Sequence, residues 1–495
     1  MLLARGLAAA AVLAGIAAWL SFLRGGLVLS HYDARAHLVV ARRIIDNITP
    51  GWPQIGAVWL PLPHLLHAVP AQVDAWYRTG FFGSLVSVAC FGVTTYALTR
   101  MVLVVTGSRL GAAVTAALLI LNPNLLYLHA TPMTEPLLLA TTSLALLWLY
   151  EWVPLNETRV PVRLGVALLA AVWTRYEGWL IVAAALVAAV YAAARIGASR
   201  AALLQRALRL GVWPAAAVLL FVGISRATTG SWLVSGGFYE RDPYYDGQLV
   251  RSVLAVWWGT HQLSTRTTEV VAMAAAALVA VRALAARPDA PLLVPVTLFA
   301  AAALPAYAFY AGHPFRVRYM VPLVAACALF GGVAVGVMRR HAAMVTAGLL
   351  VGITLLQSPP WRQDAPVIVE ARSDEPLRRG RRHVTACLAA EYGGEKILAS
   401  MGSLAHYMQE LSHAGFEISD FVHEGNGAIW ELTMETGPAL HTGWMLVEEQ
   451  AEGGDVLARR IRQAPEFLRG MTRVCEGGGV ALYRRDNVFS FSWPS

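Results

Sequence analysis

The sequence predicts an α-helical polytopic membrane protein with about eleven transmembrane helices and a C-terminal exterior α/β domain. Hydrophobic residues make up 57% of its 495 positions and charged residues only 14%, a composition typical of chains that use lipid as solvent. Many apolar runs also approach the roughly 20 residues that cross a hydrocarbon core. After Pro359 and Pro360 these runs shorten, and charged residues, glycines and short strand-like segments alternate.

Nine apolar runs each predict one membrane span: Leu7–Val28, Phe81–Thr106, Ala112–Leu128, Glu135–Trp152, Leu210–Ile224, Glu269–Leu284, Leu292–Tyr310, Met320–Val337 and Met344–Leu356. A further run, Leu164–Ala194, is too long for a single span and is interrupted by the polar segment Thr174–Trp179. We interpret it as two short helices that meet at this break, which brings the expected number of spans to eleven.

The distribution of arginine predicts the orientation of these spans. With the N-terminus in the cytoplasm every inside turn is basic, as the positive-inside rule requires. The Asp33 loop, the break at Thr174–Trp179, the long loop Arg226–Arg266 and everything after Pro359 then lie outside. A cleaved signal peptide is the alternative for the first thirty residues, but cleavage would shift the parity of the spans. The alanine-rich and arginine-rich usage suggests a bacterial inner membrane protein.

The soluble domain is expected over residues 359–495, after a membrane module of residues 1–358. Cys387 and Cys475 fall in this exterior part, where a disulfide is allowed. Its patterns predict an α/β order of elements: helix Pro376–Tyr392, strand Ile397–Ser400, helix Leu404–Leu411, strands Phe416–Phe421 and Trp444–Val447, helix Asp455–Gln463, and strands Thr472–Cys475 and Val480–Tyr483.

The net charge of +8 is almost entirely arginine, and membrane orientation accounts for most of it. Nucleic acid is therefore not an expected partner. Orientation rules would remove arginines from the outer side, so those that remain there are candidates to bind a phosphate through their guanidinium forks: Arg35, Arg42, Arg43, Arg175, Arg241, Arg316 and Arg318.

The loop after the first span, His31–Leu66, is the first place to look for chemistry. Asp33, its first acidic residue, is costly to hold beside lipid unless something charged binds there. A helix at about residues 34–49 would place Arg35, Arg42 and Asp46 within about 40° of one another and an apolar face opposite, which predicts an interfacial helix with that face in lipid. Beyond it, His37, Gln54 and His64 offer polar groups to a ligand.

Four further outer segments carry candidate site residues. Glu135 begins a span, where the helix dipole alone could also explain it. Arg175, Tyr176 and Glu177 interrupt an apolar run, and a charged pair at membrane depth indicates function unless the pair only holds two half-helices together. The segment Gly312–Tyr319 and the long loop supply the remaining candidates: Arg316, Arg318, Tyr319 and Tyr239.

This combination resembles the GT-C superfamily of polyprenyl-phosphate-dependent glycosyltransferases, to which the protein mannosyltransferases and the lipid A aminoarabinose transferases belong. The resemblance rests on the Asp33 after the first span, the amphipathic helix of the same loop, Glu135 in the next outer turn, the broken helix pair, and the late arginine–tyrosine motif before an exterior α/β domain. It covers the first seven spans best. One departure is that Ala34 follows Asp33, where the protein mannosyltransferases have a second acidic residue.

The resemblance implies a polyprenyl-phosphate-linked sugar donor, an acceptor that approaches from the exterior, and inversion at the sugar. The resemblance leaves the acceptor open between a protein, a lipid and a polysaccharide. Asp33 would act on the acceptor hydroxyl as general base, with Glu135 and Glu177 orienting hydroxyls or basic groups, and arginines such as Arg35, Arg175 and Arg316 or Arg318 would hold the phosphate.

Two other functions and one cofactor stay open from the sequence. A polytopic transporter or lipid-linked-sugar flippase is the rival function, although transporters place binding charges near the midplane of repeated halves. A non-enzymatic scaffold is the third. No cofactor is certain, but Asp33 with Glu135 or Asp242 could hold a divalent metal ion.

Overall fold

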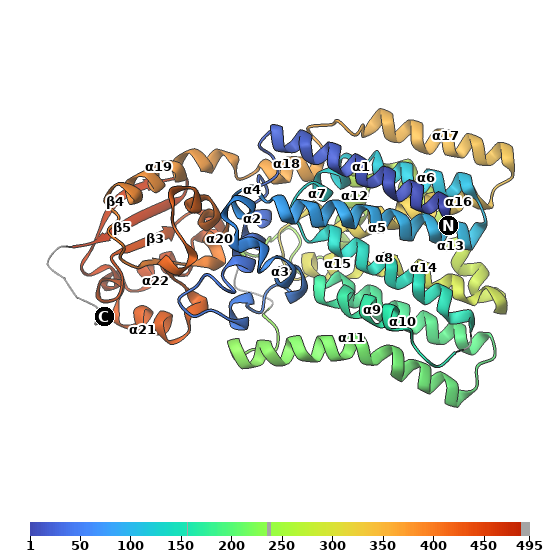
Figure 1. Cartoon of the computed structure of the whole chain (residues 1–495), viewed down its shortest axis with the longest axis horizontal. Coiled ribbons are helices and arrows are strands. Elements are labelled where there is room, and N and C mark those ends of the chain that lie inside the picture. Colours follow the sequence, from blue (N-terminus) through green and yellow to red (C-terminus); the bar gives the residue numbers. More distant parts are fainter. Residues whose placement is uncertain (156, 235–238, 487–495) are drawn as a thin grey trace.

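The structure is a computed structural model that describes residues 1–155, 157–234 and 239–486. Figure 1 shows a bundle of long helices and, at one end of it, a smaller domain with a β-sheet. The short helices α2, α3 and α4 lie between the two parts. We call the end of the bundle that faces the small domain the domain end.

The bundle contains these elements: α1 (Leu2–Arg24), α5 (Phe81–Thr106), α6 (Arg109–Ile120), α7 (Pro123–His129), α8 (Glu135–Trp152), η3 (Val153–Leu155), α9 (Val162–Thr174), α10 (Glu177–Arg195), α11 (Arg200–Thr229), α12 (Leu249–Ser264), α13 (Arg266–Ala285), η4 (Arg287–Leu292), α14 (Leu293–Val296), η5 (Thr297–Ala302), α15 (Ala303–Tyr310), η6 (Val317–Met320), α16 (Val321–Val337) and α17 (Arg340–Gln357). In the segment Val317–Val337, 89% of its most apolar 18-residue stretch is buried inside the protein. The corresponding share is 17% in α1 and 22% in α11 and in α17. Helix α16 therefore forms the centre of the bundle, and α1, α11 and α17 form its lipid-facing margin.

Among the described residues, nine helices are long and apolar enough to cross a membrane, or ten if the bent pair α6 and α7 counts as one span. The expected eleventh span is α9, which is an apolar helix of only 13 residues. It meets α10 at the predicted break, where Trp179 Nε1 donates a hydrogen bond of 2.8 Å to the Val172 carbonyl. Gly178 permits this close approach, because a Cβ there would lie 2.2 Å from the Ala171 oxygen.

Helix α12 was not expected, since the sequence analysis assigned residues 226–266 to a loop. Its start and its end both lie at the domain end of the bundle. Gly247 donates to the carbonyl of Tyr310, which closes α15, and Asn122 Nδ2 donates to the Leu263 carbonyl at the bend between α6 and α7. A 16-residue helix that begins and ends on the same side does not add a span.

The first loop folds into α2 (Tyr32–Arg42), η1 (Trp52–Ile55), α3 (Pro61–His67), η2 (Pro70–Gln72) and α4 (Asp74–Thr79). Helix α2 ends at Arg42, earlier than the expected limit near residue 49. Its apolar residues Leu38 and Val39 belong to the hydrophobic core of the small domain instead of facing lipid. The amphipathic pattern identified the helix, but a protein surface covers its apolar face.

The small domain carries a five-stranded sheet of order β2-β1-β3-β5-β4, in which β1 pairs in parallel with β2 and β3, and β5 is antiparallel to β3 and β4. A disulfide joins Cys387 to Cys475. Its elements are α18 (Pro366–Arg372), α19 (Glu375–Glu391), β1 (Ile397–Ala399), α20 (Met401–Leu411), η7 (Ser412–Ala414), η8 (Ile418–Asp420), β2 (Phe421–Val422), η9 (Glu424–Asn426), α21 (Ala428–Thr436), η10 (Pro438–Leu440), β3 (Trp444–Glu448), η11 (Ala451–Gly453), α22 (Val456–Gln463), η12 (Pro465–Leu468), β4 (Met471–Gly477) and β5 (Val480–Arg485).

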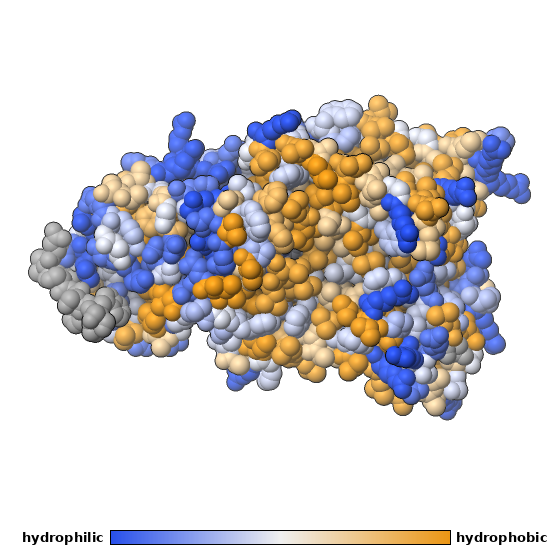
Figure 2. All heavy atoms as spheres, viewed as in Figure 1, coloured by the Kyte–Doolittle hydropathy of each residue, from blue (hydrophilic) through white to orange (hydrophobic). Residues whose placement is uncertain are grey.

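The α/β class of this domain is confirmed, with one strand misplaced. The apolar pattern predicted a strand over Phe416–Phe421, but β2 begins only at Phe421, because Glu417 and Asp420 form a reciprocal capping box that turns the chain through η8. Figure 2 shows hydrophobic residues over most of the visible bundle surface and hydrophilic residues over the small domain. This division is the one expected of a membrane module that carries a solvated domain.

Candidate functional site

Charged side chains from five segments converge at the domain end of the bundle. They come from the first turn of α2, the first turn of α8, the break between α9 and α10, the segment η6 that leads into α16, and α18 of the small domain. All of these positions are helix ends or breaks, where the chain can present polar groups without interrupting a membrane-spanning helix.

Asp33 and Arg318 form the centre of this cluster. The Arg318 Nη2 lies 2.5 Å from Asp33 Oδ2, and the side chains are 4% and 9% exposed. Burial alone would raise the pKa of Asp33, but the positive charge of Arg318 and its hydrogen bond to the carboxylate hold that pKa well below the usual range of an aspartate. Asp33 is therefore an ionised carboxylate held by an arginine.

Glu135 joins this pair to a second arginine. Its Oε1 lies 3.0 Å from Arg175 Nη1 and 3.5 Å from Arg318 Nη1, while its Oε2 has no hydrogen-bond partner among the described residues. Glu135 stands at the first position of α8 and is 1% exposed, so the helix N-terminus and two guanidinium groups stabilise its charge. Glu135 is thus stabilised by the helix dipole and is also a member of the charged cluster.

Arg175 also contacts Glu177, at 2.9 Å from its Nη2, and donates 2.9 Å from Nη1 to the Thr134 hydroxyl. Arg175 and Glu177 thus form an ion pair at the helix break, as expected of a pair that holds the two half-helices together. The pair is nevertheless not closed on itself, because the same guanidinium reaches Glu135 from α8. Tyr176, between them in the sequence, packs its ring against Trp179 and Phe221, 5.3 and 6.3 Å between centroids.

Glu370 of α18 is a site residue that the sequence analysis missed. Its Oε1 lies 2.9 Å from Arg318 Nε, and its Oε2 accepts a hydrogen bond from the Val317 backbone N–H at 3.1 Å. His31 accepts from the Asp33 N–H through Nδ1, so its Nε2 carries the proton that faces Glu370 at 3.4 Å. A lone glutamate in the soluble domain gave no sequence signal, because only the docking of α18 brings it to Arg318.

Aromatic and basic side chains surround Arg318 on the remaining sides. Its guanidinium carbon lies 5.9 Å from the Tyr32 ring centroid and 5.7 Å from that of Tyr319. Arg316 contacts the same Tyr32 ring at 5.9 Å, so both arginines of the segment reach this site although they are two residues apart. Tyr319 is linked through its hydroxyl to His313, 3.2 Å away, and the ring of Tyr239 lies 4.4 Å from that of His313.

His37 lies one helical turn after Asp33 and pairs with His64 of α3, 3.1 Å between Nδ1 and Nε2. Burial lowers the pKa of His37 to about 3, although Asp33 opposes this shift, and burial also lowers the pKa of His64 well below its usual value. Both imidazoles are therefore neutral at physiological pH.

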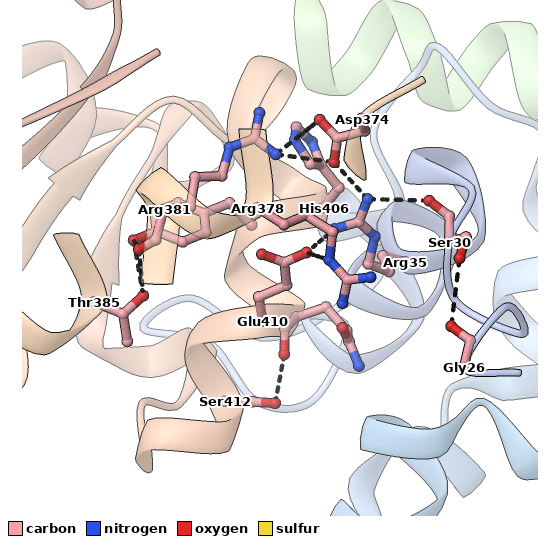
Figure 3. A network of polar contacts seen from close by, with 12 residues as sticks. Gly26, Ser30, Arg35, Asp374, Arg378, Arg381, Thr385, His406, Glu410 and Ser412 are labelled. Carbon is pink, nitrogen blue, oxygen red and sulfur yellow. Dashed lines mark hydrogen bonds and ion pairs between the residues drawn. The ribbon is translucent and has the colours of Figure 1, made fainter. Parts of the chain in front are cut away.

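Three other predicted residues lie elsewhere. Arg35 is fully buried against the small domain, where it forms ion pairs with Glu410 and with Asp374, the latter at 2.6 Å (Figure 3). Arg42 pairs with Asp46 and Asp74 at 2.8 and 2.6 Å. The Gln54 side chain donates to the carbonyls of Thr49 and Gly425, which fastens the loop after α2 to the small domain. Arg35 and Gln54 thus contact the small domain, whereas Arg42 is paired within the first loop, and the structure gives each of them a protein partner.

The acid pairs predicted as metal ligands, Asp33 with Glu135 and Asp33 with Asp242, do not form a shared site with free carboxylates. Arg318 bridges Asp33 and Glu135, so a guanidinium occupies the place that a shared cation would take. Asp242 belongs to another segment, where its carboxylate accepts the Tyr244 N–H at 2.9 Å.

The chain shares its fold with two solved structures over almost its whole length. One is ArnT from Cupriavidus metallidurans bound to undecaprenyl phosphate, with a TM-score of 0.53 and 13% sequence identity, covering 97% of this chain and 99% of that one. The other is the same protein in the apo state, with a TM-score of 0.53, 14% identity and the same coverage. The sequence matches no protein-family model and no curated protein. The two structures thereby confirm the fold that the resemblance implied.

Proposed function

We propose that this protein is a membrane glycosyltransferase that moves a sugar from a polyprenyl-phosphate-linked donor to an acceptor at the domain end of the bundle. The observation that carries the proposal is the convergence of Arg175 and Arg318 on Glu135 beside the buried Asp33. Two guanidinium groups at this depth suit a lipid phosphate, because arginine forks match phosphate oxygens and burial strengthens the attraction. The fold supports it, since the ArnT structure of the same fold holds undecaprenyl phosphate.

Donor binding exchanges ligands at Arg318. Its guanidinium contacts three carboxylates, Asp33, Glu135 and Glu370, so an incoming phosphate replaces one of them. Replacement of Asp33 removes the contact that holds its pKa low and places a second negative charge beside it, and both changes raise that pKa. The carboxylate then becomes a better base once the donor is in place.

The transfer step follows from this arrangement. Asp33 takes the proton of the acceptor hydroxyl, whose oxygen attacks C1 of the sugar from the side opposite the phosphate. The bond between C1 and the phosphate oxygen breaks, and polyprenyl phosphate leaves with the electron pair, stabilised by Arg175 and Arg318. A single displacement of this kind inverts the configuration at C1. Glu135 and Glu177 keep the two guanidinium groups in position.

The proposed orientation places this chemistry outside the cytoplasm. With a cytoplasmic N-terminus, the turns at the far end of the bundle from the small domain carry basic pairs such as Arg339 and Arg340, as the positive-inside rule requires. The site and the small domain are then exterior, on the outer face of a bacterial inner membrane.

Purified protein tests the proposal. Incubated with a panel of polyprenyl-phosphate-linked sugars and extracellular acceptors, the wild-type chain should release free polyprenyl phosphate, and Arg318→Gln should not. Movement of the lipid-linked sugar across vesicles without any release would contradict a transferase and support a flippase. An exterior location of a tag fused to the C-terminus would support the orientation.

A further inference from the structure

Beside the charged cluster lies a small cavity that the transfer step does not use. It is lined by residues of α2, α3, α5, the segment before α8 and α8 itself, among them His37, His67, Ser87 and Thr134. The cavity has room for a group about the size of one water molecule. Thr134 connects it to the charged cluster, because its hydroxyl accepts a hydrogen bond from Arg175.

The hydrogen bonds of the histidines fix which ring nitrogens carry protons. His64 Nδ1 lies 3.0 Å from the Leu60 carbonyl, which can only accept, so this nitrogen is the donor. In a neutral ring His64 Nε2 is then an acceptor, and the nitrogen facing it, His37 Nδ1, must donate. The chain of bonds leaves His37 Nε2 without a proton.

His67 reaches the same state by a separate bond, since its Nδ1 lies 2.5 Å from the Pro63 carbonyl. The Nε2 atoms of His37 and His67 are both buried, and neither finds a hydrogen-bond partner in the part of the chain that the structure describes. His37 is 7% exposed. A buried acceptor without a partner is costly, so this cavity favours a group that brings a donor.

Neighbouring rings and burial stabilise the assigned tautomer of His37. The Trp59 ring packs on it at 4.1 Å between centroids and stacks on His64 at 5.8 Å, which restrains both imidazoles. Burial keeps the pKa of His37 low, so the ring stays neutral and its Nε2 stays an acceptor near pH 7.

We propose that this cavity receives a hydroxyl group of the donor sugar, which donates a hydrogen bond to His37 Nε2, and that His64 is a positioning residue that sets the His37 tautomer. This inference rests on the proposed function. The sugar is attached directly to the phosphate, and Thr134 places the cavity one side chain away from Arg175. A site of bare acceptors selects a sugar with a hydroxyl at this position over the deoxy or O-methyl analogue.

Binding measurements on the full-length protein in detergent test this contact. The probes are undecaprenyl phosphate and a panel of undecaprenyl-phosphate hexoses. Wild-type protein should bind at least one hexose lipid about tenfold tighter than the phosphate alone, since leaving the acceptor unpaired costs of the order of a factor of ten or more. In His37→Phe this ratio should fall to near one with the affinity for undecaprenyl phosphate unchanged, and His37→Gln, which keeps an acceptor, should restore part of it.

Nitrogen NMR of the histidine side chains gives an independent readout. The Nε2 of His37 and His67 should be unprotonated at neutral pH, and a hexose lipid should shift the His37 signal where undecaprenyl phosphate does not. In His64→Phe the His37 tautomer should no longer be fixed.

The outcomes separate the two proposals. If undecaprenyl phosphate does not bind, or Arg318→Gln binds it as well as wild type, the proposed function fails. If the phosphate binds but no hexose improves on it, or His37→Phe keeps the wild-type ratio, the sugar contact is overturned. Equal weakening of both lipids in His37→Phe would also overturn it, because that result indicates a structural histidine.

Discussion

Asp33 Oδ2 and Arg318 Nη2 lie 2.5 Å apart. The pair joins two segments that are distant in the sequence, the first turn of α2 and the segment η6 that precedes the central helix α16. Each residue is buried, so each charge depends on the other. The pair is therefore a structural connection, and under the proposed function it is also one of the contacts of Arg318 that an incoming phosphate can replace. This double role makes the following consequences testable.

Replacing Asp33 by Asn should abolish sugar transfer while the protein stays folded. The amide cannot take the acceptor proton, and loss of a general base lowers rates by about 10²–10⁴-fold. Release of polyprenyl phosphate by purified protein measures the effect. Asp364→Asn, at an exposed carboxylate of the linker after α17, is the matched control and should keep full activity. Retained activity in Asp33→Asn would remove the proposed role.

Glu370→Gln should reduce transfer about 10- to 100-fold without unfolding the protein, a loss typical of residues that orient a functional group. The amide still accepts from the Val317 N–H but no longer balances the charge of Arg318 or receives the His31 proton as a carboxylate does. The loss should appear in kcat more than in the affinity for undecaprenyl phosphate. Glu375→Gln, an exposed change one helix away, is the control. Wild-type kcat in Glu370→Gln would contradict the assignment.

Arg35→Met should destabilise the contact between the bundle and the small domain. The change leaves Asp374 and Glu410 partly buried with one cation fewer, although Arg381 and Arg378 still contact them (Figure 3). We expect a loss of about 3 kcal/mol, the order found when one partner of a buried ion pair is removed. Thermal unfolding in detergent measures it, with the exposed Arg379→Met as control. Equal unfolding temperatures for the two variants would argue against this role for Arg35.

Stability should fall as the pH is lowered from about 7 to 5, in part through His406. Burial lowers the pKa of His406 to about 3, so the native state keeps it neutral while the unfolded chain takes up a proton near its ordinary pKa of about 6.5. The unfolded state binds more protons in this window, and stability therefore rises with pH there. In His406→Asn the unfolding temperature should depend less steeply on pH between 7 and 5. An unchanged slope would contradict the prediction.

Removing the disulfide should destabilise the small domain. Cys387 and Cys475 are separated by 88 residues and join α19 to β4, so the bond restricts a long loop of the unfolded chain. The double variant Cys387→Ser with Cys475→Ser should lose about 2–4 kcal/mol. Reducing agent should lower the unfolding temperature of wild-type protein and leave that of the double variant unchanged. Equal sensitivity of the two proteins would be inconsistent with a structural bond.

Much of the fold could be predicted from local patterns. The apolar runs and the break at Thr174–Trp179 depend only on nearby residues, because a lipid-facing helix must satisfy its own backbone hydrogen bonds. Helix α12 was missed because it lies within a segment that was assigned to an outer loop. No local pattern shows that this segment folds back along the domain end as a helix that does not cross the membrane. Strand β2 was misplaced because a capping box outweighed β propensity.

The site was predictable where charge contradicted environment. Asp33, Glu135, Arg175, Glu177 and Arg318 stood out as charges at the ends of apolar runs, and the structure brings these five together. Arg35 carried the same signal but faces the small domain, since one helix can present charges to two different partners. Glu370 gave no signal at all, because solvated glutamates are common in soluble domains.

The sequence by itself determined the environment of this protein: which segments cross lipid, which part is solvated, and which charges are costly enough to require a partner. Only the tertiary structure decided which partner each charge has. Hydrophobic periodicity and charge are properties of neighbouring residues, whereas the pairing of Asp33 with Arg318 and the reach of Glu370 into the same cluster follow from how helices that are distant in the sequence dock.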